Sequence, residues 1–431
     1  MQDTIFALAS GAGRSAISVF RLSGPRSIWA VEALSGTACP ADRKLRLRTL
    51  RRPTDHEPID QALVVGFAEA ESFTGEACAE LHCHGGRAVV AAISSALASL
   101  EGLRPASAGE FARRALENGR LNLLQVEAIA DLVNAETEAQ RRQAFGGMRG
   151  GLAARALAWR ESLLQALAWL EVELDFSDQD VDEGLFAEAV ARLSDVAREI
   201  GAEVSRGISA RLIRDGFVVA LVGAPNVGKS SLLNAIMRRD IAITSAFAGT
   251  TRDTLEAQCD LGGFCVSFLD TAGLQDTEDP LDAMGVARGR ARAAEADLRI
   301  FVADPDHDFV VDGEQDGDIF VSNKADLRGK RRSSEGLAVS ALTGEGVDHL
   351  LERVAEVVRS RVDEDAVVFR ERHLAVMNRA VSLLESAVAQ SRPECAAEDV
   401  RGAAGALEAL LGRIDVEDVL GEIFSGFCIG K

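Results

Sequence analysis

The stretch GAPNVGKSS, residues 223–231, decides the fold of the central part of this 431-residue chain. It matches the pattern G-x-x-x-x-G-K-S and stands between the strand-like run 217–222 and the helix-like run SLLNAIM. In that context the backbone N–H groups of the loop cradle phosphates at a helix N-terminus. Lys229 then reaches the outer phosphates, and the Ser230 hydroxyl binds Mg²⁺. A chance match in a glycine-rich turn is disfavoured, because both flanks have the required pattern.

Two later motifs supply groups for a γ-phosphate and its metal ion. GTTRD, residues 249–253, offers Thr251 as a second Mg²⁺ ligand. DTAG, residues 270–273, follows a strand-like run. Its Asp270 is expected to act on Mg²⁺ through water, and the backbone N–H of Gly273 is expected to sense the γ-phosphate.

Two further motifs favour guanine as the base. NKAD, residues 323–326, ends in Asp326, whose carboxylate can accept hydrogen bonds from both N1 and N2 of guanine. Adenine lacks that donor pair, so the motif selects GTP over ATP. SAL, residues 340–342, can contact the guanine oxygen through its backbone. All five motifs in this order predict a guanine-nucleotide-binding domain. The residues expected to contact GTP are Asn226, Val227, Gly228, Lys229, Ser230, Ser231, Ser245, Ala246, Phe247, Ala248, Gly249, Thr250, Thr251, Asp270, Thr271, Ala272, Gly273, Asn323, Lys324, Ala325, Asp326, Ser340, Ala341 and Leu342.

The residue that orients the attacking water in many GTPases is missing. Those proteins carry Gln directly after D-x-x-G, whereas this chain has Leu274, which cannot hold water. Asn226, inside the phosphate loop, is a candidate ligand for a monovalent cation that stabilises the developing charge. Ser245 and Thr250, with backbone carbonyls between them, would complete its shell.

The hydrophobic pattern divides the chain into four zones. Residues 1–118 mix strand-like and helical runs, which predicts an α+β domain. Residues 119–212 and 363–431 are helical, and we expect them to pack as one discontinuous helical domain. Residues 213–362 alternate strands with helices, which predicts an inserted α/β domain with a parallel sheet. Apolar residues at helical spacing in the two helical zones are Leu152, Ala156, Trp159, Leu163, Ala166 and Leu170, then Leu374, Met377, Val381, Leu384 and Val388.

Composition restricts the class of protein. The net charge of −20 argues against a general nucleic-acid binder, since phosphate neutralisation needs clustered Lys and Arg. No apolar run reaches the length of a membrane span, and the N-terminus lacks the pattern of a signal peptide. The seven cysteines form no C-x-x-C pair, which favours a reducing compartment and hence the cytoplasm.

Several motifs together resemble the MnmE/TrmE family of tRNA-modification GTPases. The resemblance covers essentially the whole chain. It rests on the phosphate loop with Asn226 and on the motifs AGTTRD, DTAGL, DTIFALAS, FRLSG, SFTGE, GEFARRALENGRLNL and QVEAIADLV, together with the terminal FCIGK. The resemblance implies a tetrahydrofolate-binding α+β domain, followed by a helical domain into which the GTPase domain is inserted.

The resemblance also implies a function and partners. Members of the family form homodimers through their N-terminal domains and work with the FAD-dependent subunit MnmG in a heterotetramer or larger complex. They install aminomethyl or carboxymethylaminomethyl groups at C5 of the wobble uridine of certain tRNAs. The tRNA would be held largely through the partner. A tetrahydrofolate derivative (5-formyl or 5,10-methylene) would be the cofactor, and K⁺ would activate GTP hydrolysis.

Residues are assigned by the same resemblance. Asn226, Ser245, Phe247 through its backbone, and Thr250 match the K⁺ ligands, and Ser230 and Thr251 match the Mg²⁺ ligands. The positions that match the folate contacts are Arg21, Glu80, Arg120 and Lys431. The family's catalytic glutamate aligns with Asp282, which is one methylene shorter. Either the water must sit closer or the helix must shift, and hydrolysis is expected to be slow.

Two short stretches keep alternative interpretations. His82 and His84 in HCH resemble metal ligands, but no second cluster has zinc spacing, so a strand end that lines the folate pocket is favoured. The terminal CIGK that begins at Cys428 is not a prenylation motif, because Gly430 stands at an aliphatic position and Lys431 is not one of the residues that end such a motif. A nucleophilic role for Cys428 stays open, and Lys431 at the end of the tail is the favoured cofactor contact.

The function itself also has alternatives. A GTP-timed scaffold would leave the modifying chemistry to its partner. A ribosome-assembly GTPase of the same superfamily would have no role in tRNA modification.

Overall fold

The computed structural model describes residues 3–11, 13–175, 184–239, 256–270, 296–309, 311, 317–327, 336–363, 370–412 and 430. The chain forms two compact units. The first comprises Met1–Ala130, Met148–Arg160 and Ala404–Lys431, and the second comprises Asp131–Gly147 and Glu161–Ala403. Each unit contains one six-stranded sheet. Among the described residues, no helix is long and apolar enough to cross a membrane.

The sheet of the first unit has the strand order β3-β4-β5-β2-β1-β6. Its neighbouring strands are antiparallel except for β1 and β6, which are parallel. The strands are β1 (Thr4–Leu8), β2 (Ser15–Ser23), β3 (Arg46–Arg51), β4 (Pro58–Phe67), β5 (Cys78–Gly85) and β6 (Leu103–Pro105). Its shorter helices are α1 (Ser27–Ser35), η1 (Glu69–Glu71), α2 (Arg87–Ala98) and α3 (Glu110–Glu117).

The two faces of this sheet differ, because side chains alternate along each strand. Phe20 and Leu22 of β2 are buried in a core with residues of α1 and α2. The opposite face presents Ile17, Leu47 and Leu63, whose exposed fractions are 60, 61 and 40%. Leu47 and Leu63 are direct partners across β3 and β4. One face is therefore the core, and the other is an open surface with large apolar side chains.

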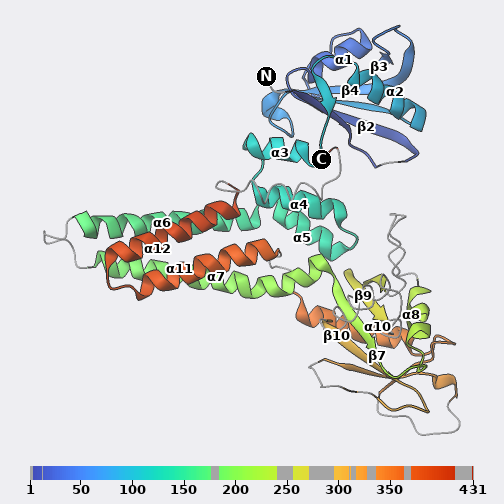
Figure 1. The fold of residues 1–431 in the computed structure, drawn as a ribbon, viewed down its shortest axis with the longest axis vertical. Helices are drawn as coiled ribbons and strands as arrows, with labels where there is room; N and C mark the ends of the chain where they lie inside the picture. The colour runs from blue at the N-terminus through green and yellow to red at the C-terminus, as the bar shows by residue number, and fades with distance from the viewer. Residues whose placement is uncertain are drawn as a thin grey trace, which may run out of the picture. The chain divides into compact units, whose positions relative to one another are not determined.

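A second set of helices belongs to neither sheet. They are α4 (Leu123–Asn134), α5 (Glu138–Met148), α6 (Gly151–Asp175), α7 (Leu185–Asp215), α11 (Glu371–Ala389) and α12 (Pro393–Leu410). Helices α7 and α11 lie side by side in the second unit (Figure 1). The stripe predicted on α6 is confirmed, since all six of its residues are buried. On α11 the predicted stripe is confirmed at Met377 and Leu384, which are buried, whereas Leu374, Val381 and Val388 are only partly buried. The buried face consists of His373, Met377, Ala380, Leu384 and Ala387.

The sheet of the second unit has the order β12-β11-β10-β7-β9-β8. All neighbours are parallel except the edge pair β8–β9. The strands are β7 (Phe217–Val222), β8 (Glu256–Leu261), β9 (Phe264–Asp270), β10 (Leu298–Ala303), β11 (Ile319–Ser322) and β12 (Leu337–Ala338). Three described helices accompany it: α8 (Lys229–Met237), η3 (Ala325–Leu327) and α10 (Val347–Arg361). The predicted fold class, an α+β domain with helices and a parallel α/β sheet, is confirmed.

The parallel strands explain where polar groups collect. Central strands are buried on both faces, so β7 is a continuous apolar run and β10 is apolar apart from Arg299. The carboxyl ends of parallel strands meet at one edge of the sheet, where ligands bind in such folds. The segments that leave β7, β9, β10 and β11 begin at that edge.

Candidate functional site

The phosphate loop connects β7 to α8 at this edge. Gly228 caps α8 with a φ of 95°, and a Cβ there would lie 2.4 Å from Nδ2 of Asn323. A Cβ at Gly223 would lie 2.3 Å from the carbonyl oxygen of Val302. Only glycine fits either position, so the loop packs its backbone directly against the ends of β10 and β11.

Lys229 lies inside this loop. Its side chain is almost fully buried, and Nζ donates hydrogen bonds to the carbonyl oxygens of Gly223 at 2.8 Å and Ala224 at 2.9 Å. Burial lowers the pKa of the Lys229 ammonium, and the charge of Asp270 partly opposes that shift. The structure thus places the ammonium within the turn that is expected to surround the phosphates.

The two oxygen groups expected at Mg²⁺ are adjacent. The Ser230 hydroxyl, in the first turn of α8, donates a hydrogen bond to Oδ2 of Asp270 at the end of β9. A hydroxyl and a carboxylate are hard oxygen donors of the kind that Mg²⁺ prefers. The chemistry of this pair therefore fits the ion.

The base-recognition motifs are held together by side-chain hydrogen bonds. Nδ2 of Asn323 donates to the carbonyl oxygen of Val227 at 2.9 Å, and its Oδ1 accepts from the backbone N–H of Ala341 at 3.1 Å. The hydroxyl of Ser340 donates to Oδ1 of Asp326 at 2.5 Å, which orients that carboxylate. The structure brings the phosphate loop, NKAD and SAL to one place, as expected if they form one nucleotide site.

Sequence reasoning missed one residue of this arrangement. Asp304 follows β10 directly, and its buried carboxylate accepts a hydrogen bond from Nζ of Lys324 at 2.5 Å. The same Nζ donates to the carbonyl oxygen of Asn226 at 3.0 Å. A signal was available, because an acidic residue directly after a central parallel strand lies at the ligand-binding edge.

Arg21 and Glu80, two of the positions assigned to folate, face each other in the first unit. Nε and Nη2 of Arg21 both lie 3.1 Å from Oε1 of Glu80, across the paired strands β2 and β5. Oε2 of Glu80 lies 3.1 Å from Nε2 of His82. The Arg21 guanidinium also lies 5.4 Å from the centre of the Phe73 ring. A charged pair beside an aromatic ring has the donors and the stacking surface that a pterin needs.

Arg120 is not part of that pair in the described residues. Its exposed side chain lies at Gly75, where an added Cβ would come within 3.0 Å of Cγ of Arg120. No contact joins Arg120 to Arg21 or Glu80 among the described contacts.

The histidines of HCH point as predicted. His82 and His84 lie toward the open face of β5 and Cys83 is buried in the core. His84 pairs with Asp60, with Nδ1 at 2.7 Å from Oδ1. Within the described ranges, no group of three or more His, Cys, Asp and Glu side chains could hold a metal ion.

A further set of predicted site residues lies outside the described residues. These are Ser245, Ala246, Phe247, Ala248, Gly249, Thr250, Thr251, Thr271, Ala272, Gly273, Asp282, Cys428 and Lys431.

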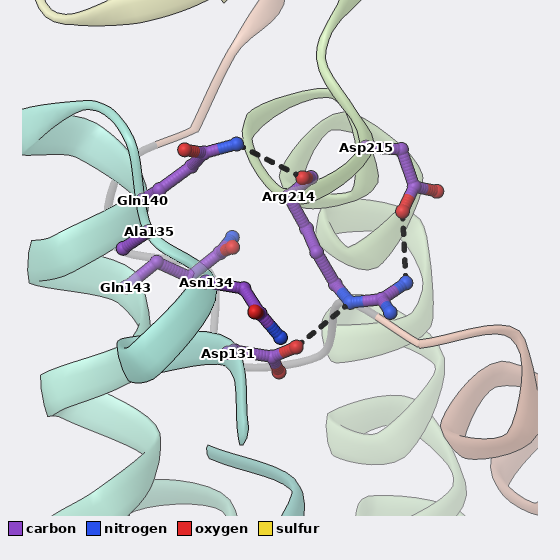
Figure 2. Close-up of a pocket in the computed structure, with 7 residues that line it drawn as sticks. All are labelled: Asp131, Asn134, Ala135, Gln140, Gln143, Arg214 and Asp215. Atoms are coloured by element: carbon purple, nitrogen blue, oxygen red, sulfur yellow. Dashed lines mark hydrogen bonds and ion pairs between the residues drawn. The ribbon is translucent and has the colours of Figure 1, made fainter. Parts of the chain in front are cut away.

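A polar pocket of about 140 Å³ lies elsewhere in the second unit, among α4, α5 and the end of α7 (Figure 2). It is lined by Asp131, Asn134, Ala135, Gln140, Gln143, Arg214 and Asp215.

Asp131 of this pocket holds two arginines. Oδ1 of Asp131 accepts hydrogen bonds from Nε of Arg214 at 3.2 Å and from Nη2 of Arg370 at 2.6 Å. Arg214 stands in the last turn before β7 and Arg370 directly precedes α11. One carboxylate therefore joins the two places where the chain enters and leaves the inserted segment.

Amide side chains of α5 strengthen the same junction. Nε2 of Gln140 donates to the carbonyl oxygen of Arg214 at 3.1 Å, and Nε2 of Gln143 donates to that of Ala210 at 2.9 Å. The last carbonyls of a helix lack partners within it, so such donors stabilise the end of α7. The backbone N–H of Ala139 bonds to the carbonyl of Gly263 in the β8–β9 turn at 3.0 Å. Sequence reasoning gave no sign of this junction.

Comparison with known families matches both parts of the chain. Residues 4–120 match the model described as GTP-binding protein TrmE N-terminus, and residues 123–428 match the MnmE helical domain. A tRNA modification GTPase MnmE from Cereibacter sphaeroides is 48% identical over 434 residues, with 100% of both chains covered. Its counterpart from Roseobacter denitrificans is 46% identical over 434 residues, and that from Caulobacter vibrioides 47% over 453, again with full coverage of both chains.

Solved structures resemble parts of the chain. The G domain of the T. maritima FeoB iron transporter is 26% identical, has a TM-score of 0.22, and covers 32% of this chain and 97% of its own. Aquifex aeolicus Era is 24% identical, with a TM-score of 0.24 and coverage of 41 and 69%. Scores this low carry no argument, so membership rests on the family models and the full-length relatives. The resemblance predicted from the motifs is confirmed, and the chain belongs to the MnmE family of tRNA-modification GTPases.

Proposed function

We propose that this protein hydrolyses GTP in the course of tRNA modification. The observation that carries the proposal is the full-length identity of 48% to a tRNA modification GTPase. The joined phosphate loop, Asp270 and NKAD motif support it, because they hold the groups that a guanine nucleotide needs.

The described residues divide the work of binding. The Lys229 ammonium would neutralise phosphate charge, and its buried position would strengthen that interaction in a site with little water. Ser230 would bind Mg²⁺ and Asp270 would hold a water of that ion, which supplies charge neutralisation at the β- and γ-phosphates when bound. The Asp326 carboxylate would accept from N1 and N2 of guanine, and Ser340 would keep it aimed.

Hydrolysis needs groups beyond these. We propose that Asp282 positions the attacking water, and that Gly273 and Thr251 contact the γ-phosphate and the Mg²⁺. Asn226, Ser245, Phe247 and Thr250 would hold K⁺, which supplies positive charge near the bridging oxygen. Of the K⁺ ligands only Asn226 lies in the described residues. Its φ of 64° is left-handed, a conformation that asparagine tolerates better than most residues.

The open face of the first sheet supports two more proposals. Arg21 and Glu80 would bind a tetrahydrofolate derivative, with Arg120 and Lys431 as further contacts and Cys428 as a possible nucleophile. The exposed Ile17, Leu47 and Leu63 lie on the face that carries Glu80, and would meet a second copy in a homodimer.

We further propose that an FAD-dependent MnmG subunit joins this dimer in a heterotetramer or larger complex in the cytoplasm. This complex would install aminomethyl or carboxymethylaminomethyl groups at C5 of the wobble uridine. The tRNA would bind largely through that partner. The domains would comprise residues 1–118, residues 119–212 with 363–431, and the inserted residues 213–362.

Nucleoside mass spectrometry of tRNA from cells lacking the protein tests the function. Loss of the modified wobble uridine, restored by the wild-type chain, is expected. Unchanged wobble uridine with defective ribosomal subunits would instead indicate a ribosome-assembly GTPase. A scaffold role would be indicated if Cys428→Ser and the folate-site variants Glu80→Gln and Arg21→Gln all restored full modification.

The proposed K⁺ site has a separate test. Potassium in place of sodium should raise the GTPase rate, and an unchanged rate would contradict the K⁺ site at Asn226.

A further inference from the structure

Asp304 has no assigned role, yet its side chain has 0% exposed surface. Its two carboxylate oxygens serve different groups. Oδ1 accepts from the backbone N–H of Asp306 at 3.0 Å and of His307 at 2.8 Å, and lies 2.8 Å from Nδ1 of His307. Oδ2 accepts from Nζ of Lys324 at 2.5 Å. One oxygen therefore shapes the turn after β10, while the other faces the nucleotide site.

Lys324 carries this contact onward to the phosphate loop. Its Nζ also donates to the carbonyl oxygen of Asn226 at 3.0 Å. Both residues have left-handed backbones, with φ of 59° for Lys324 and 64° for Asn226. Such conformations are costly for residues other than glycine and persist where neighbouring groups hold them. The Lys324 ammonium connects the two strained turns, and the buried Asp304 carboxylate holds that ammonium in place.

We propose that Asp304 is a positioning residue for nucleotide binding, which holds the Lys324 ammonium against the Asn226 carbonyl and so keeps the phosphate loop in its binding shape. The proposal rests on the proposed nucleotide site, where Lys324 of the NKAD motif is expected to contact GTP. An ammonium has three N–H donors. Two of them go to Asp304 and Asn226, which leaves one donor for a bound nucleotide.

The charge of Asp304 supports this role. Burial by itself raises the pKa of a carboxyl group, yet the hydrogen bonds from Lys324, His307 and the backbone lower the pKa of Asp304 to about 2. The group is thus a carboxylate at neutral pH, and a charge-assisted hydrogen bond to an ammonium is stronger than a neutral one.

A purely structural role is the competing explanation, since Oδ1 organises the turn 304–307. Asp304→Asn separates the two roles. The asparagine keeps a carbonyl oxygen for the turn, but it replaces the charged oxygen facing Lys324 with an amide that cannot accept from the ammonium. Thermal unfolding of the full chain shows whether the turn survives the change.

The test is a double-mutant cycle on nucleotide release. Stopped-flow fluorescence measures the dissociation rate of a fluorescent GDP analogue from the full chain as wild type, Asp304→Asn, Lys324→Ala and the double variant. Asp304→Asn should raise the dissociation rate about tenfold, as expected for losing a hydrogen bond between charged groups. The double variant should release GDP no faster than Lys324→Ala alone. His307→Ala, which removes one bond to Oδ1 and spares Oδ2, should change the rate less than about twofold.

Each other outcome has one meaning. If Asp304→Asn releases GDP at the wild-type rate, the positioning role is wrong. If its effect is just as large in the Lys324→Ala background, Asp304 acts through the fold and not through Lys324, which also overturns the proposal. If Lys324→Ala leaves release unchanged while Asp304→Asn accelerates it, the role assigned to Lys324 fails, and this inference fails with it. If the wild-type chain binds neither GTP nor GDP, the proposed function fails, and this inference, which rests on it, fails with it.

Discussion

The hydroxyl of Ser230 donates a hydrogen bond to the carboxylate of Asp270, and this contact joins the first turn of α8 to the end of β9. The two residues are separated by 40 positions in the sequence. Their contact means that the phosphate loop and the strand that leads into DTAG are mutually aligned by the two groups that are proposed to act on Mg²⁺.

Replacing Asp270 by Asn should therefore weaken Mg²⁺ binding. The amide keeps the size of the side chain but removes its charge, and a group acting through a metal-bound water typically contributes 10- to 100-fold in affinity. The GTPase rate as a function of Mg²⁺ concentration should show a midpoint shifted upward by about that factor. Asn234→Ala, on the exposed side of the same helix α8, is the control and should leave the midpoint in place. An unshifted midpoint for Asp270→Asn would remove Asp270 from the metal site.

Base selection can be redirected at Asp326. The side-chain N–H of asparagine would face the N2 donor of guanine, which cannot accept a hydrogen bond. Xanthine has an oxygen at C2 instead, and that oxygen can accept a hydrogen bond from the asparagine N–H. Asp326→Asn should lose affinity for GTP on the order of a hundredfold and gain affinity for XTP, since a bidentate pair contributes about 1–3 kcal/mol of discrimination. Competition between the two nucleotides for a fluorescent analogue measures both changes. Loss of GTP binding without a gain for XTP would point to misfolding instead of altered recognition.

The Asp131 junction should matter for stability. Asp131, Arg214 and Arg370 have side-chain exposures of 15, 33 and 18%. Removing the carboxylate takes an ion-pair partner from two partly buried cations, while Arg214 keeps its pair with Asp215 at 2.8 Å. We expect Asp131→Ala to cost roughly 2–3 kcal/mol, below the 3–5 kcal/mol of fully buried pairs. Hydrogen exchange at the C-terminal turns of α7 should accelerate accordingly.

Asp195 provides a matched control on the same helix. Its pair with Arg198 has a length of 2.5 Å, but the side chains are 65 and 74% exposed. Exposed pairs contribute about 0–1 kcal/mol, so Asp195→Ala should leave exchange almost unchanged. Equal effects of the two substitutions would contradict a special role for Asp131.

Acid should weaken the first unit through Glu110. Burial raises the pKa of Glu110, but hydrogen bonds from Arg104, Ser107 and Arg114 outweigh it and lower the pKa from 4.5 to about 2. A lowered pKa in the folded state stabilises the fold above pH 4.5, and this contribution is lost as pH falls from 4.5 toward 2. Glu110→Gln should therefore reduce protection of the Ala106 amide, which bonds to Phe6, at pH 7 and have little effect near pH 2. A difference that persists undiminished at low pH would contradict the linkage.

Self-association should depend on the open sheet face. Leu63→Asp places a charge among exposed apolar side chains, and it should shift the proposed dimer toward monomer in sedimentation experiments. Trp29→Gln is the control, because Trp29 is 43% exposed on α1, which covers the opposite face of the sheet. If both variants sediment as the wild type does, the dimer face lies elsewhere.

The sequence predicts well where one local pattern is strong. The phosphate loop, NKAD and the central strands were expected because each carries its own signature. Strand β8 was not expected: its buried residues are Ala257, Cys259 and Leu261, and Glu, Gln and Asp stand between and beside them. The buried face of α11 was displaced because alanines and a histidine occupy its centre, where periodicity analysis looks for large apolar residues.

Long-range pairs were the other limit. Asp304 and Lys324 are 20 positions apart, and Asp131 and Arg370 are 239 apart. Neither pair leaves a periodic trace, because a single charge on a strand end or helix looks the same whether it is solvated or buried. Family motifs predict the residues that contact ligands. The residues that position those side chains come from distant parts of the chain and become evident only in the folded structure.

The junction at Asp131 also bears on how such a chain can be divided. Since Arg214 and Arg370 reach the same oxygen atom, the ends of the segment between them lie within two side-chain lengths of each other. A domain with adjacent termini can be removed and its host rejoined by a short linker, or the reverse. Excising residues 216–369 and bridging Asp215 to Arg370 with a few glycines should thus leave α7 and α11 able to pack. The original ends of the excised segment should likewise be joined by a short linker in a circular permutant of that segment.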